Sequence, residues 1–112
     1  MAKKYNLGNV GGISKTILYD TDITSAGSYP LNSSVDNFKM IIVEAYYAHE
    51  DGKKYHQGTA ICTPLKYAKA HMVTHGDSSM SCCSMFHFSK DGGSIIADYV
   101  YGEIITKIYG IN

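Results

Sequence analysis

Short runs of β-branched, aromatic and other apolar residues recur along the chain about 8 to 12 residues apart, separated by Gly, Asn and Asp residues that favour turns. Runs this short favour β-strands joined by turns over long helices. The eleven glycines fit this pattern, because they cluster in turns, where a positive φ is often needed. The pattern predicts an all-β fold, an antiparallel, jelly-roll-like β-sandwich of about seven to eight strands.

The predicted strands follow one another closely. They cover residues 15–19, 38–48, 55–62, 65–75, 80–89, 94–101 and 104–111, with a further edge segment up to Leu31 that carries Gly27 and Pro30. The Asp-Gly pair at 51–52 and the Lys-Asp-Gly-Gly turn at 90–93 each indicate a hairpin between the flanking runs. Helix is the alternative for residues 38–48 and for residues 65–75.

The last segment, residues 104–112, is apolar on both sides of its predicted strand. Strict alternation puts Ile105, Lys107, Tyr109 and Ile111 on one face and Ile104, Thr106, Ile108 and Gly110 on the other. Because both faces are largely apolar, we expect a central strand of a sheet or a strand at a subunit interface.

Length and composition indicate one folded unit. A chain of 112 residues with 45% hydrophobic residues can supply a single core. Residues 1–14 contain Gly8, Gly11 and Gly12 without a sustained periodicity, which predicts a flexible N-terminal arm or stalk connection. Residues 15–112 are predicted to form the β-sandwich domain.

Charge and hydropathy disfavour two classes of partner. Ten Lys and Arg residues balance ten Asp and Glu residues, and the basic runs are the short pairs at 3–4 and 53–54, so we expect no nucleic-acid partner. No segment approaches the roughly 20 apolar residues of a membrane-spanning helix, so we expect no membrane insertion. The N-terminus lacks the apolar segment of a signal peptide, which predicts synthesis in the cytoplasm.

The cysteines and histidines lack the spacing of a structural metal site. Cys62, Cys82 and Cys83 are odd in number, which argues against a disulfide framework, and we expect small, buried, reduced side chains. On a strand, His71 and His75 lie too far apart to share one small ion, although a three-fold axis would bring copies of one histidine together. We therefore predict no cofactor and no metal site.

The sequence carries no catalytic signature. Nucleophilic catalysis would need Cys62 with one of His56, His71 or His75, or Ser84 with His87, but no known nucleophile motif surrounds these residues. The acidic residues are scattered without the facing pair that glycoside hydrolysis requires. We predict that the protein is not an enzyme.

Tyrosine is the residue type most suggestive of binding, since the chain has ten tyrosines and no tryptophan. A tyrosine ring stacks on sugars or packs against another subunit, although tyrosine in strands also fits a half-buried surface without any ligand. Polar and aromatic residues also gather at 49–56 and 75–79, where ordinary solvated turns are the alternative. The candidate ligand-binding residues are His49, Asp51, Tyr55, His56, Asp77, Tyr99 and Tyr101.

Three segments of the chain resemble the C-terminal modules of bacteriophage and prophage tail fibres and related virion appendages. They are the Thr-Ile-Leu-Tyr-Asp run at 16–20, the Val-Asp-Asn-Phe-Lys-Met-Ile-Ile-Val run at 35–43 and the Ile-Ile-Thr-Lys-Ile-Tyr-Gly-Ile run at 104–111. Such modules often open on a Leu-Tyr-polar strand and end on Ile-x-Lys-Ile-Tyr-Gly-Ile. Residues 53–89 carry none of these motifs.

The resemblance implies a small β-sandwich head at the tip of a fibre, usually a homotrimer. It further implies a protein made in the host cytoplasm, displayed on the virion and in contact with other fibre or baseplate proteins. Attachment to the host cell surface is then the expected function, with a glycan as the expected ligand. The alternative is a structural fibre cap, decoration or assembly protein that binds no ligand.

Overall fold

The computed structural model describes residues 9–10, 13–48, 53–64, 66, 68–76 and 81–112. The described residues form nine strands and one short 3-10 helix. The strands are β1 (Asn9–Val10), β2 (Ile13–Tyr19), β3 (Gly27–Pro30), β4 (Met40–Ala48), β5 (Lys54–Cys62), β6 (Ala70–Gly76), β7 (Ser81–Phe88), β8 (Ser94–Tyr101) and β9 (Glu103–Ile111), and the helix is η2 (Val35–Asn37).

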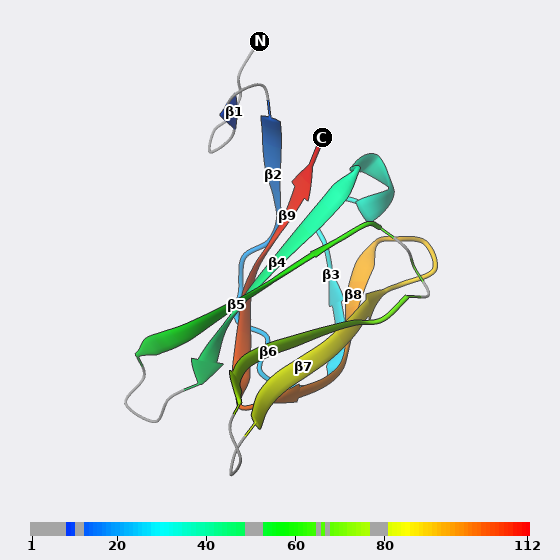
Figure 1. Ribbon diagram of the computed structural model, residues 1–112. Helices are drawn as coiled ribbons and strands as arrows, with labels where there is room; N and C mark the ends of the chain where they lie inside the picture. The colour runs from blue at the N-terminus through cyan, green and yellow to red at the C-terminus, as the bar shows by residue number, and fades with distance from the viewer. Residues whose placement is uncertain (1–8, 11–12, 49–52, 65, 67, 77–80) are drawn as a thin grey trace.

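Two antiparallel sheets pack face to face, which confirms the predicted all-β sandwich. One sheet has the order β1-β2-β9-β4-β5 and the other the order β3-β8-β7-β6 (Figure 1). The pairs β2-β9 and β3-β8 bring the early and late parts of the chain together, as in a jelly roll. The pairs β4-β5, β6-β7 and β7-β8 are local hairpins.

The last strand, β9, lies in the middle of its sheet, which is one of the two positions that its apolar faces predicted. It is hydrogen-bonded to β2 on one side and to β4 on the other (Figure 1). The predicted strict alternation is wrong, however, because the register against β4 shifts at Thr106, the extra residue of a β-bulge. Ile105 and Ile108 therefore both point into the core, and Lys107 and Tyr109 lie on the outer face.

Several strand boundaries differ from those predicted. The strand expected at 38–48 begins at Met40, because η2 and its C-cap Phe38 occupy the preceding residues. The strand expected at 65–75 begins at Ala70, after a connection that includes Pro64. In the predicted arm, residues 9–10 pair with residues 13–14, and residues 1–8 and 11–12 lie outside the described residues.

The core between the sheets consists of aliphatic and aromatic side chains that alternate inward along the strands. Phe86 and Phe88 of β7 contact each other edge to face, with ring centroids 6.0 Å apart. The buried cluster comprises Leu18, Ile23, Val35, Ile41, Val43, Ala45, Met72, Phe86, Phe88, Ile95, Ala97, Ile105 and Ile108. Burial of this apolar surface is the main favourable contribution to folding.

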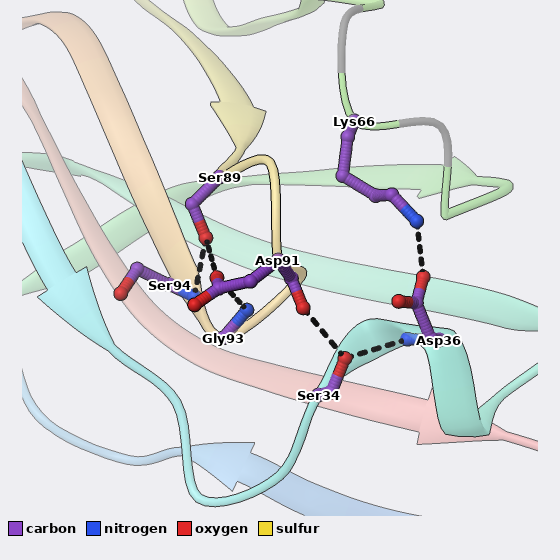
Figure 2. A network of polar contacts seen from close by, with 7 residues as sticks. All are labelled: Ser34, Asp36, Lys66, Ser89, Asp91, Gly93 and Ser94. Atoms are coloured by element: carbon purple, nitrogen blue, oxygen red, sulfur yellow. Dashed lines mark hydrogen bonds and ion pairs between the residues drawn. The ribbon is translucent and has the colours of Figure 1, made fainter.

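A polar network fastens the β7-β8 turn to the segment that contains η2 (Figure 2). The carboxylate of Asp91 accepts hydrogen bonds from the hydroxyl of Ser89 and the backbone N–H of Gly93. Ser34 donates to the backbone carbonyl of Asp91, and its hydroxyl oxygen accepts from the N–H of Asp36. Asp36 in turn pairs with Lys66 of the β5-β6 connection, so the network joins three separate segments.

Two glycines allow close approach where a side chain would not fit. A Cβ on Gly58 of β5 would lie 2.9 Å from Thr74 Cγ2 on β6, so Gly58 brings the two sheets together at this edge. A Cβ on Gly110 of β9 would lie 2.6 Å from Cδ2 of the Phe38 ring. The Phe38 ring therefore lies flat on the backbone of β9 and covers that end of the core.

We expect Gly110→Ala to lower the free energy of unfolding by about 1–3 kcal/mol, because the added methyl group must displace the Phe38 ring or β9. Urea denaturation measures this change. In a chain that already carries Phe38→Ala, Gly110→Ala should cost far less. Equal costs in the two backgrounds would contradict the proposed contact.

Candidate functional site

The structure separates the candidate residues that it describes. Tyr99 and Tyr101 lie on β8, whereas His56 lies on β5 of the other sheet, with its ring 5.6 Å from that of Tyr47. His49, Asp51 and Asp77 lie outside the described residues, and Tyr55 belongs to β5 but its side chain is not described. Among the candidates whose side chains are described, Tyr99 and Tyr101 are thus the two that share one strand.

Tyr99 and Tyr101 project from the outer face of the β3-β8-β7-β6 sheet. Tyr101 is 69% exposed and Tyr99 is 38% exposed. The strand register places them in two rows across β8, β7 and β6: Tyr99-Met85-His71 and Tyr101-Cys83-Val73. We call these six residues the tyrosine face.

A charged group borders the tyrosine face because of a second β-bulge. Met85 pairs with Tyr99 and Phe86 pairs with Ala97, which leaves Asp98 as the extra residue of β8. A bulge re-aims side chains, and here Asp98 forms polar contacts beside Tyr99. Its Oδ2 lies 2.9 Å from Nδ1 of His87, and its Oδ1 lies 3.3 Å from Nζ of Lys69.

The environment of Asp98 keeps its carboxyl group ionised. Partial burial raises the pKa of Asp98, but the hydrogen bonds and charges of His87 and Lys69 outweigh this effect and lower the pKa overall. Asp98 therefore presents a carboxylate next to Tyr99 at neutral pH. A carboxylate beside aromatic rings suits a ligand that has hydroxyl groups on an apolar ring.

Contacts within the face hold the Tyr99 ring. The rings of His71 and Tyr99 meet edge to face with centroids 6.2 Å apart. Desolvation, followed by interactions with Cys83 and Glu103, raises the pKa of Tyr99, so its hydroxyl group remains a hydrogen-bond donor at neutral pH. The tyrosine face combines aromatic surface with polar groups that both donate and accept hydrogen bonds.

Sequence reasoning identified the two tyrosines but not their neighbours. The sequence offered His71 as a possible metal ligand or catalytic partner and His87 as a possible catalytic partner, and it gave no role to Asp98. Nothing in the sequence indicates the bulge that sets Asp98 beside His87 and Lys69. The one available signal was the spacing of Tyr99 and Tyr101, which two-residue alternation places on the same side of a strand.

Other groups in the described residues do not form a competing site. No three His, Cys, Asp or Glu side chains come together there in a way that could hold a metal ion. Burial raises the pKa of Cys62 to about 11, so its thiol is protonated at neutral pH and a poor nucleophile. No helix within the described ranges is long and apolar enough to cross a membrane.

A small cavity opens beside Lys69. It has a volume of about 80 Å³ and is lined by Cys62, Thr63, Ala68, Lys69, Ala70, Phe86 and Phe88. Pockets for small molecules usually enclose about 300–1,000 Å³. This cavity is therefore too small for a sugar.

Beneath the tyrosine face lies a buried acid, Glu103, at the start of β9. Its side chain is only 2% exposed, and both carboxylate oxygens lack a hydrogen bond of normal geometry. Burial raises the pKa of Glu103, although nearby Ser84, Thr74 and His71 partly oppose this effect. The folded state therefore favours the protonated carboxylic acid more than the unfolded chain does.

Comparison of this chain with protein-family models, with curated proteins and with solved structures found no match.

We expect Asp98→Asn to destabilise the protein at neutral pH, because the variant loses the charge that pairs with His87 and Lys69. A carboxyl group with a lowered pKa in the folded state contributes stability above its unfolded pKa of about 3.9, and that stability is lost as the pH falls through the folded pKa. Urea denaturation should therefore give a lower free energy of unfolding for the variant than for the wild type at pH 6–7. This difference should shrink as the pH is lowered. A difference independent of pH would contradict this account.

Glu103→Gln should have the opposite effect. As the pH rises above the unfolded pKa of about 4.3, the wild-type chain loses free energy of unfolding, because its buried carboxyl group resists ionisation. Glutamine does not ionise, so the variant has no such loss. The variant should gain stability relative to the wild type between acidic and neutral pH, as measured by urea denaturation at each pH. If the stability difference between the two proteins stays constant across this range, Glu103 does not titrate as a buried acid.

Proposed function

We propose that this protein attaches a particle to a host cell surface by binding a glycan on the tyrosine face. The observation that carries this proposal is the exposure of Tyr99 and Tyr101 on one sheet face, with the ionised Asp98 adjoining Tyr99. Sugars have apolar ring faces that stack on tyrosine and hydroxyl groups that bond to carboxylates. Side chains on paired strands also form a more rigid surface than side chains on a loop.

The resemblance of residues 16–20, 35–43 and 104–111 to phage and prophage tail-fibre modules supports a place at the tip of a virion fibre. In this proposal the fibre is a homotrimer, made in the host cytoplasm and joined to other fibre or baseplate proteins. Single sugar sites on open surfaces are weak. Three sites per fibre and many fibres per particle raise the effective affinity without new contacts.

A purely structural role as a fibre cap, decoration or assembly protein is the second candidate. The feature that favours it is Tyr109 of β9, which is 6% exposed and covered by Lys15, with Nζ 4.0 Å from the ring centroid. Tyr109 therefore serves packing rather than binding. The exposed pair on β8 distinguishes the two candidates, because a structural cap has no need of a tyrosine face.

A glycan array of bacterial envelope polysaccharides tests the proposal. The wild-type chain should bind a subset of the glycans, and Tyr99→Ala and Tyr101→Ala should each weaken binding at least tenfold, about 1.4 kcal/mol. Tyr46→Ala is the matched control, because Tyr46 lies on the other sheet, with Nζ of Lys54 4.9 Å from its ring centroid. Binding that survives both β8 variants, or no binding by the wild type, would overturn the proposal.

A further inference from the structure

The outer face of the β2-β9-β4-β5 sheet differs from the tyrosine face in being apolar over much of its area. The register aligns Ile17, Tyr109, Ile42 and Ile61 in one row across all four strands. Ile111 and Met40 pair in the adjacent row, next to Lys15. We call these six apolar residues, Ile17, Met40, Ile42, Ile61, Tyr109 and Ile111, the apolar patch.

The apolar patch is partly open to solvent in the single chain: Ile17, Ile42 and Ile111 are half-buried, and Tyr109 is buried beneath the Lys15 side chain. Ile61 is 65% exposed and Met40 is 39% exposed. The outer face of a sandwich sheet normally carries polar residues, which alternate with the inward-facing core residues. A contiguous apolar patch on such a face indicates a surface that another protein covers.

We propose that other copies of this chain cover the apolar patch, in a closed ring of identical subunits. Charged residues on either side of the patch support this choice. On β9, Lys107 lies two residues before Tyr109 and Ile111 lies two residues after it. Lys15 of β2 pairs with Ile111, and Glu44 of β4 pairs with Lys107. Lys15 and Glu44 thus lie on opposite sides of Tyr109, along one diagonal of the sheet.

This diagonal is self-complementary. Lys15 of one subunit meets Glu44 of the next when the two patches are in contact, and the same pairing recurs at every interface of a closed dimer or trimer. The formal net charge of zero adds no overall repulsion between copies. A foreign partner would need its own matching charges, whereas a second copy of this chain already has them.

The size of the face fits this occupant. Four strands about 4.8 Å apart and about nine residues long span roughly 19 by 30 Å. Each partner in a standard protein interface contributes about 800 Å². The accessible area of this face is of the same order, because protruding side chains add to its flat area. The inference adds a specific contact surface to the proposed fibre and does not depend on glycan binding.

Light scattering after size-exclusion chromatography tests the inference on the full chain. The wild type should have the mass of a dimer or trimer at micromolar concentrations, and Ile61→Lys should be monomeric. Val73→Lys is the matched control, because Val73 is a β-branched residue, 51% exposed, on the other sheet. A monomeric wild type would overturn the inference whatever the glycan array shows, and so would an oligomer that Ile61→Lys leaves intact.

A charge exchange tests the pairing itself. Lys15→Glu and Glu44→Lys should each weaken association at least tenfold, and the double variant should restore it. Circular dichroism of every variant shows whether the sheet has folded, which separates loss of the interface from loss of the fold. Folded single variants that associate like the wild type, or a folded double variant that stays dissociated, would overturn the pairing of Lys15 with Glu44.

Discussion

The pairing of β9 with strands on both sides is the constraint on which the rest of the structure depends. β9 lies between β2 and β4 and pairs with both, so the last strand of the chain connects an early strand, β2, to β4. Ile105 and Ile108 fill the core from this position, and the backbone of Gly110 supports the Phe38 ring. With this strand in place, the first sheet has one face in the core and the apolar patch on the other.

Two of the β-bulges determine which side chains face outward at β9 and at the tyrosine face. The bulge at Thr106 returns Ile108 to the core and sends Lys107 and Tyr109 outward. The bulge at Asp98 brings a carboxylate beside Tyr99 and within reach of His87 and Lys69. A β-bulge therefore shapes the core at β9, and another shapes the candidate binding site at β8.

The sequence predicted most of the strands, though not all of their boundaries, because the apolar runs are separated by Gly, Asn, Asp or Pro residues that mark turns. It also limited residues 104–111 to two positions, a central strand or an interface strand, and named Tyr99 and Tyr101 as candidate binding residues. It could not predict the bulges, since a register shift depends on the partner strand rather than on the residues that bulge. The roles of Asp98, His71 and Lys69 at the site follow from those shifts and from contacts between distant segments.

The two outer faces give the protein two separate surfaces, one aromatic and polar, the other apolar. Mapping by NMR tests this division most directly: the ¹⁵N-labelled chain is titrated with the glycan that binds most strongly on the array. We expect the backbone amide shifts to change around His71, Met85, Asp98, Tyr99 and Tyr101 and to stay constant in β2, β9 and β4. Changes centred on the apolar patch or around His56, or no change at all, would contradict this division.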